Sequence, residues 1–460
     1  MPRLRAGSKE LTCLVEDNDM NKTLFETLAK SLIKSLQADE QLSLSLEAED
    51  SFYVRLNRHK VRQTFKLSQG NITLRFMKNQ RYVLHTIPFG NDGDLNHQKA
   101  LAEIESCRWA AEQLPPDPFC PTFVKANESN SSEEHQAKLP LDEDWFDLIF
   151  PLFQGNLQDC AGLLTSGRVM RGVYDSLGQS HWFSRDNFTL DLSFYTPQQK
   201  AVKFLYSNHQ WSAKDVEKKL ETVKQQLALL DQPDRQIKPG RYRTYFAPQA
   251  VAELATLLSP AASHYYQGSS PFQKLANGQT LSPKVTLVED FSLGLSPRFN
   301  SLGETAPLRL DLIQDGVLKN WLTSTRTAQE HNLPSNYSEE YEGMRSPHLM
   351  PGTLPTQDIL SALDTGLYVS NLHYLNWSDL NTGRLTGMTR YACFWVENGK
   401  ITAPIQDLRF DESLYHFLGN GLVDLTDFVE IMADTSTYDK RSVGGLCMPG
   451  LLVDGFNYTL

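Results

Sequence analysis

The sequence lacks the short motifs that mark most metal-dependent and nucleophile-dependent enzymes. It has eleven histidines among 460 residues, but no two stand three to five positions apart, so no H-E-x-x-H zinc pair is present. A G-x-S-x-G nucleophile motif, a P-loop and a dinucleotide-binding fingerprint are also absent. A catalytic centre in this chain would therefore have to be assembled from residues far apart in the sequence.

The sequence also lacks long hydrophobic runs, clustered cysteines and an excess of basic residues. It has no stretch of about 18 apolar residues and no apolar signal-peptide core near its start, so we expect a cytoplasmic protein without a membrane segment. The six cysteines form no C-x-x-C pair, so we expect free thiols in a reducing compartment. The net charge of −11, without a basic face, argues against nucleic-acid binding.

The first half of the chain contains clear periodic segments. Residues 22–37 place leucines four apart, as on one buried face of a helix, and a second helix is predicted over 97–114. Between these helices, alternating polar and β-branched or aromatic residues predict an antiparallel meander of three strands, at 43–58, 61–80 and 81–89.

The rest of this half is predicted to contain one loop, several strands and a helix. Residues 125–140 are polar and predict an exposed loop. A helix over 212–230 is indicated by an S-x-x-D start at Ser212 and a regular apolar face. Further strands are predicted at 145–150, 167–176, 179–185, 188–196 and 200–207.

A segment rich in proline and charge, 231–242, marks the expected domain boundary. We therefore expect an α+β fold with an N-terminal domain over 1–237 and a C-terminal domain over 238–460. The second domain is predicted to be rich in antiparallel sheet. It contains two hairpins, whose turns are Asp315-Gly316 and Asn398-Gly399.

Four stretches of the second half follow one another in a characteristic order. They are LSPKVTLVED (281–290), LRLDLIQDGVLKNW (308–321), MPGTLPTQDILSALDTGLYV (350–369) and TGRLTGMTRYACFWVENGKITAPI (382–405). In these stretches the chain resembles the TldD/PmbA family, a metalloprotease-related family also called modulators of DNA gyrase, with a good match over 238–460. The resemblance implies a C-terminal domain of strongly curved antiparallel sheet, a pseudo-barrel, and two chains paired around a central cavity.

The resemblance also locates the family's zinc helix. TldD-like members carry H-E-x-x-x-H on the first helix of this domain. Alignment of LLSPAASHYYQGSSPF (257–272) with that helix places Ser259 and Pro260 on the His-Glu pair and His264 on the second histidine. A hydroxyl is a poor zinc ligand, and proline offers no proton acceptor and predicts a helix break near 260. We therefore expect these three positions to be degenerate, with no catalytic residue, no metal and no cofactor in this chain.

Two other groups of residues have the chemistry of a site. Cys447 lies in a glycine-rich stretch, and we expect a buried structural cysteine rather than a reactive thiol. The acidic pair Glu289-Asp290 is expected in a solvated turn rather than at a metal.

The resemblance implies a TldE (PmbA)-like member, which lacks the zinc ligands and pairs with an active subunit. We therefore expect a non-catalytic subunit of a zinc peptidase complex that degrades or matures unfolded peptides, with zinc held by a TldD-like metalloprotease partner. Two alternatives stay open. One is a self-sufficient metallopeptidase or other hydrolase that uses an unrecognised site, such as Cys447 or His264 with distant ligands. The other is a homodimeric peptide-binding protein without enzyme activity.

Overall fold

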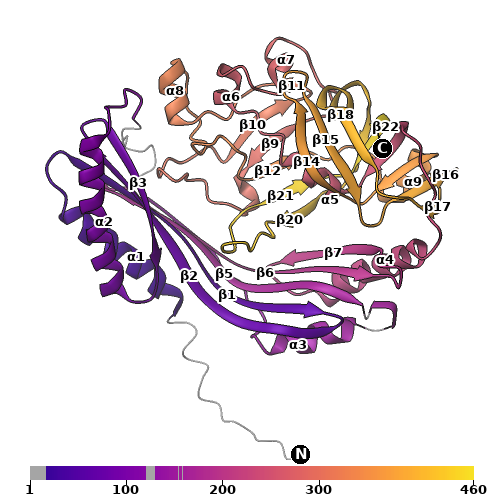
Figure 1. Cartoon of the computed structure of the whole chain (residues 1–460), viewed down its shortest axis with the longest axis horizontal. Coiled ribbons are helices and arrows are strands. Elements are labelled where there is room, and N and C mark those ends of the chain that lie inside the picture. Colours follow the sequence, from indigo (N-terminus) through magenta and orange to yellow (C-terminus); the bar gives the residue numbers. More distant parts are fainter. Residues whose placement is uncertain (1–16, 121–129, 154, 158, 460) are drawn as a thin grey trace, which may run out of the picture.

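The computed structural model describes residues 17–120, 130–153, 155–157 and 159–459. Strands of three sheets, covered by mostly short helices, make up this part of the chain, so the predicted α+β fold is confirmed. One long sheet lies beneath the C-terminal half, which sits over it as a second layer (Figure 1). The sheets formed by the described residues are open and do not close into a barrel.

The N-terminal sheet has the strand order β3-β2-β1-β5-β6. β4 and β7 share the remaining edge of β6, where β4 pairs in parallel with its first half and β7 pairs antiparallel with its second half. The three-stranded antiparallel meander β1-β2-β3 is confirmed. The strands are β1 (Glu40–Asn57), β2 (Lys60–Lys78), β3 (Arg81–Phe89), β4 (Asn130–His135), β5 (Cys160–Asp175), β6 (Ser180–Tyr195) and β7 (Ala201–Asn208).

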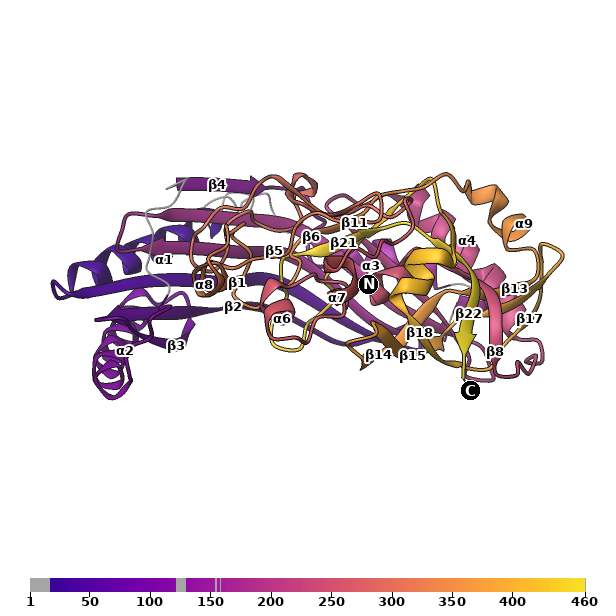
Figure 2. The ribbon, with the colours of Figure 1, turned by 90° about the horizontal axis from the view of Figure 1, so that it is seen from above.

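Helices cover the two ends of this long sheet (Figure 2). At one end, α1 (Asp17–Lys34) and α2 (Gly93–Gln113) bury Leu28, Leu32 and Ile104 against the strands. At the other end lie α3 (Asp144–Ile149) and α4 (Ala213–Leu230). The predicted start of α4 is confirmed, because the Ser212 hydroxyl accepts a hydrogen bond from the Asp215 amide at 3.3 Å.

Three sequence predictions for this half need correction. The run 145–150 is not a strand but the helix α3, in which Trp145 and Ile149 lie four apart and are both buried. The predicted loop 125–140 contains β4, whose polar backbone pairs with the edge of β6, while 121–129 lie outside the described residues. The two strands predicted at 179–185 and 188–196 form the single strand β6.

The C-terminal half contains two sheets, with strand orders β11-β10-β9-β12-β21-β20 and β14-β15-β18-β22-β8-β13-β16-β17, and β19 also pairs with β22. The strands are β8 (Gly240–Phe246), β9 (Leu287–Asp290), β10 (Arg309–Gln314), β11 (Val317–Leu318), β12 (Pro347–Leu349), β13 (Gly366–Val369), β14 (Asn371–Asp379), β15 (Arg384–Arg390), β16 (Phe394–Glu397), β17 (Lys400–Pro404), β18 (Arg409–Ser413), β19 (Leu422–Leu425), β20 (Glu430–Ala433), β21 (Gly445–Met448) and β22 (Leu451–Tyr458). The helices are α5 (Pro248–Ala255), α6 (Ala262–Tyr266), α7 (Gln273–Ala276), α8 (Thr325–His331) and α9 (Ile359–Leu363).

Both predicted hairpins of the C-terminal half are confirmed. β10 pairs with β11, and β16 pairs with β17, each across a two-residue turn. Both residues of each turn have positive φ angles, which is the geometry that Asp-Gly and Asn-Gly turns favour. The turns are Asp315-Gly316, with φ of 50° and 76°, and Asn398-Gly399, with φ of 49° and 71°.

The loop between β20 and β21 joins the two layers. Arg441 in this loop is buried, and it donates hydrogen bonds to the Ser51 hydroxyl at 3.0 Å and to the Asn187 side chain in the N-terminal sheet. Lys440 forms an ion pair with Glu47 at 3.0 Å. These contacts hold the C-terminal half against the N-terminal sheet, while the domain boundary at 237/238 stays a prediction. Within the described residues, no helix is long and apolar enough to cross a membrane.

Candidate functional site

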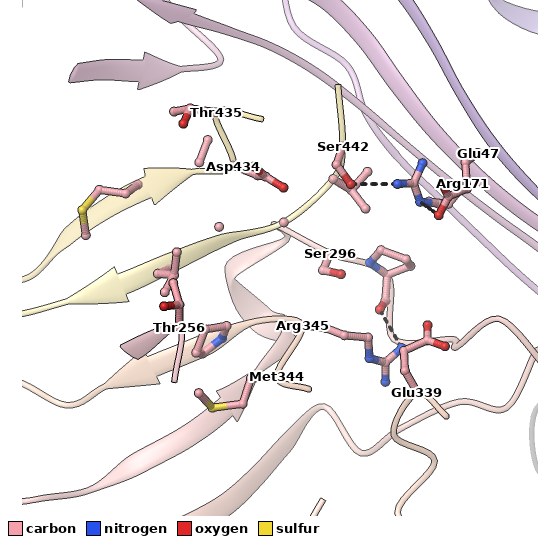
Figure 3. A pocket seen from close by; sticks show the side chains of 18 of the residues that line it. Glu47, Arg171, Thr256, Ser296, Glu339, Met344, Arg345, Asp434, Thr435 and Ser442 are labelled. Carbon is pink, nitrogen blue, oxygen red and sulfur yellow. Dashed lines mark hydrogen bonds and ion pairs between the residues drawn. The ribbon is translucent and has the colours of Figure 1, made fainter. Parts of the chain in front are cut away.

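A cavity of about 880 Å³ lies between the N-terminal sheet and the C-terminal half. Its lower wall comes from β1, β2 and β5, which contribute Glu47, Arg75 and Arg171. Its upper wall comes from α5, the segment 339–347 and the β20–β21 loop (Figure 3). Segments from both ends of the chain therefore build this site, a concave cavity of a size that can hold a ligand.

The helix α5 presents one face to the cavity. Its lining residues are Gln249, Ala252, Glu253 and Ala255, followed by the C-cap residue Thr256. The opposite face, including Val251 and Leu254, is buried in the core. The carboxylate of Glu253 is exposed to the cavity, and the protein around it raises its pKa above the usual value, because part of its hydration is lost. This face therefore offers one carboxylate and no imidazole.

The three residues aligned with the family's zinc helix lie after α5. The hydroxyl of Ser259 lines the cavity and accepts a hydrogen bond from the Met344 amide at 3.2 Å. Pro260 lies between α5 and α6, as predicted from its missing N–H, and its carbonyl accepts from the Leu322 amide at 2.8 Å. His264 is exposed on α6 and is not a lining residue of the cavity. The structure thus brings Ser259 to the site and leaves His264 outside it.

Cys447 is buried in β21, as expected for a structural cysteine, with 1% of its surface exposed. Burial raises the pKa of its thiol to about 11, so the thiolate is scarce at neutral pH and the side chain is a poor nucleophile. The five cysteines in the described residues are all free.

The expectation of a solvated turn at Glu289-Asp290 is wrong, since both residues are buried in β9. Glu289 accepts hydrogen bonds from the backbone amides of Arg345, at 2.8 Å, and Ser346. Burial raises the pKa of Glu289 to about 7, and the Arg345 charge and the two amides offset only part of this effect. Asp290 lies 3.2 Å from Nδ1 of His348. Both carboxylates therefore serve to hold the β9–β12 region together.

The residues present do not fit a zinc ion. Among the described residues that line the cavity there is neither a histidine nor a cysteine, and no group of three or more metal-binding side chains gathers anywhere in the described ranges. Zinc in proteins is held by imidazole and thiolate ligands, with carboxylates as a minority partner. The described lining of the cavity therefore lacks the imidazole and thiolate donors that the family's zinc chemistry requires.

Ion pairs neutralise most of the cationic side chains in the cavity. The ion pairs are Arg75–Glu340 at 2.9 Å, Arg171–Glu47 at 3.4 Å and Lys203–Asp191. Arg171 also donates a hydrogen bond to the Ser442 hydroxyl at 2.8 Å, and this bond links the N-terminal sheet to the β20–β21 loop (Figure 3). Sequence reasoning missed these residues, because their partners lie on other elements and no local motif connects them.

Comparison with known proteins agrees with this architecture. A family model described as the PmbA/TldA metallopeptidase C-terminal domain matches residues 239–459. Metalloprotease PmbA of Escherichia coli O157:H7 is 25% identical over 230 residues. This match covers 48% of each protein, so the chain spans about half the length of that relative.

Solved structures extend the likeness to nearly the whole chain. TldE from Thermococcus kodakarensis superimposes with a TM-score of 0.74 at 15% identity, covering 95% of this chain and 100% of that one. A protein named as a modulator of DNA gyrase from Bacteroides thetaiotaomicron gives a TM-score of 0.74 at 16% identity, covering 96% of this chain and 99% of that one. At these identities the structures establish the fold alone. Through its C-terminal half, together with this fold, the chain is a member of the TldD/PmbA family of metallopeptidase-related proteins.

Proposed function

We propose that this chain is a non-catalytic, TldE-like subunit that pairs with a TldD-like zinc metalloprotease and shapes the chamber in which unfolded peptides are degraded or matured. The observation that carries the proposal is the composition of the cavity wall. On α5, the helix that faces the cavity, the lining side chains include Ala252, Glu253 and Ala255, and Ser259 lines the cavity after the helix. The described part of this wall therefore offers none of the imidazoles that a zinc peptidase site needs.

The cavity suits an extended peptide better than a compact small molecule. Its walls come from strands and loops of both layers, and its volume of about 880 Å³ is at the upper end of the usual range for ligand pockets. Extended peptides bind to such walls mainly through backbone hydrogen bonds, which give affinity with little side-chain selectivity. A cytoplasmic location belongs to the same proposal, and a homodimer of this chain stays an alternative to the complex.

One observation favours a second candidate, a self-sufficient hydrolase. Glu253 is a carboxylate in the cavity, its pKa is raised, and the described residues give it no hydrogen-bond or ion-pair partner, which suits a general base. The described residues of the cavity lining supply no thiol or imidazole nucleophile beside it, so this candidate is the weaker one.

Co-expression with the TldD-like protein of the same host tests the proposal. Binding is measured by co-purification, and cleavage of an unfolded test peptide is measured for each chain alone and for the mixture. We expect a stable complex in which this chain adds no activity by itself and alters cleavage by its partner. Cleavage by this chain alone would support the hydrolase, and a self-dimer that ignores the partner would support a peptide-binding protein without enzyme activity.

A further inference from the structure

Arg345 differs from the other cationic side chains in the cavity. Arg75, Arg171 and Lys203 each have a carboxylate within ion-pair distance. For Arg345 the described residues supply no carboxylate within 4 Å of the guanidinium, although the side chain lines the same cavity. Its positive charge therefore faces the cavity without a direct counter-ion.

Neutral groups hold the Arg345 guanidinium in place. Nη1 lies 3.5 Å from the Pro297 carbonyl oxygen, and Nη2 donates to the Tyr337 carbonyl at 3.2 Å. The guanidinium carbon lies 4.7 Å from the ring centroid of Phe291, which is a cation–π contact with a buried ring. These contacts orient the planar group but leave several of its five N–H donors unused.

Two carboxylates close to Arg345, those of Glu339 and Glu289, are committed to backbone amides. Glu339, which is drawn beside Arg345 in Figure 3, accepts from the Ser301 amide with both oxygens, at 3.1 and 3.2 Å. Glu289 accepts from the amides of Arg345 and Ser346. Ser296 adds a neutral donor on the same wall, since its hydroxyl makes no hydrogen bond with other described residues.

We propose that Arg345, assisted by the Ser296 hydroxyl, forms a subsite for a carboxylate of the bound peptide. The group is either the C-terminal carboxylate or the side chain of an aspartate or glutamate. Arginine presents a rigid fork of donors that matches the two oxygens of a carboxylate, and an arginine fixed before binding loses little entropy when the ligand arrives. This inference rests on the proposed function, because it assigns a substrate feature to the same cavity.

Charges elsewhere in the cavity confine the anionic group to this wall. Glu253 on α5 and Asp434 at the end of β20 line other parts of the cavity, and neither forms an ion pair with a described residue. They repel a second carboxylate and favour a neutral or basic peptide segment. The subsite therefore fixes the direction in which an extended peptide lies.

Peptide binding to the full-length wild-type chain, alone and mixed with its TldD-like partner, tests the subsite. The probes are three N-terminally fluorescein-labelled octapeptides of Ala, Ser, Thr and Val, measured by fluorescence anisotropy. One has a free C-terminal carboxylate, one a C-terminal amide, and one an amide with a single internal Glu. We expect at least one carboxylate form to bind about tenfold more tightly than the plain amide, and the preferred form identifies the source of the carboxylate. Equal affinities of all three would overturn the inference.

Two variants assign the preference to Arg345. Arg345→Gln is expected to abolish the carboxylate preference, and Arg345→Lys, which keeps the charge without the fork, is expected to retain part of it. Arg384→Gln is the matched control, because Arg384 pairs with Asp411 outside the cavity. Circular dichroism confirms folding, and the wild-type comparison stands even where a variant unfolds. If no peptide binds in either preparation, the proposed function fails; if peptides bind without a carboxylate preference, only the subsite fails.

Discussion

The carboxylate of Glu342 accepts a hydrogen bond from the Ser263 amide at 2.7 Å and fixes the start of α6. Its second oxygen accepts from the Ser324 amide, at the N-terminus of α8, at 2.8 Å. Glu342 is fully buried and has a positive φ angle of 52°. One buried carboxylate therefore joins two short helices that carry no long apolar face of their own.

Replacement of Glu342 tests this joint. Glu342→Gln keeps one acceptor oxygen but turns an NH₂ group toward the second amide, so a buried donor loses its partner. We expect the free energy of unfolding to fall by about 2–3 kcal/mol in urea titrations followed by tryptophan fluorescence. Glu330→Gln is the matched control on the surface of α8, where the pair with Arg326 contributes about 0.5 kcal/mol. Equal losses in the two variants would contradict the account of Glu342.

Glu289 predicts a pH dependence of stability. Its pKa in the folded chain is about 7, raised by burial from an ordinary 4.5, so the folded state binds the proton more tightly than the unfolded state. The stability that Glu289 contributes is complete below pH 4.5 and is lost as the pH rises to about 7. The unfolding free energy of wild type, measured relative to that of Glu289→Gln, should therefore fall by on the order of 2–3 kcal/mol over this range. Unfolding titrations at pH 4.5 and 8 that give the same difference would refute the buried-acid assignment.

The β20–β21 loop is expected to depend on Arg441. Arg441→Met removes its hydrogen bonds to the buried Ser51 hydroxyl and to the half-buried Asn187, which should cost about 2–3 kcal/mol in thermal or urea unfolding. Arg309→Met is the control, because Arg309 is a partly exposed arginine paired with Asp311 at 2.9 Å. If Arg441→Met lowers the unfolding free energy no more than Arg309→Met does, the hydrogen bonds of Arg441 do not stabilise the β20–β21 loop.

The variant His264→Ala distinguishes a non-catalytic subunit from a hydrolase that uses His264. Because the imidazole is exposed on α6 and lies outside the cavity lining, we expect its removal to change stability by no more than about 0.5 kcal/mol. Peptide cleavage by the mixture with the TldD-like partner should stay at the wild-type level. A loss of cleavage that survives a check of folding would return His264 to the site.

Local chemistry predicted much of the fold. The four-residue spacing of leucines in α1, the Ser212 cap of α4 and the Asp-Gly and Asn-Gly turns are decided by neighbouring residues, and the structure has them where the sequence predicts them. The run 145–150 predicts a strand, but a short apolar run fits the helix and strand periods equally well. Trp145 packs against Phe188 from a helix instead. β4 was missed because its polar residues carry no strand pattern and only the edge of β6 orders them.

The residues of the candidate site are harder to predict from the sequence. Its walls join residues as distant as Glu47 and Ser442, and the free charge of Arg345 becomes visible only when the partners of the other cavity cations are known. The motif alignment points to His264, yet the helix that faces the cavity is α5, and His264 lies on α6 outside the cavity lining. The correspondence of Ser259, Pro260 and His264 with the family's zinc helix stays a prediction.

The proposed function places the peptidase's zinc centre in the TldD-like partner and not in this chain. The most direct test is the zinc content of the purified full-length chain, measured by mass spectrometry of the metal after dialysis against zinc-containing and then zinc-free buffer. We expect much less than one zinc per isolated chain, and about one per complex once the TldD-like partner is bound. One tightly held zinc per isolated chain would contradict it.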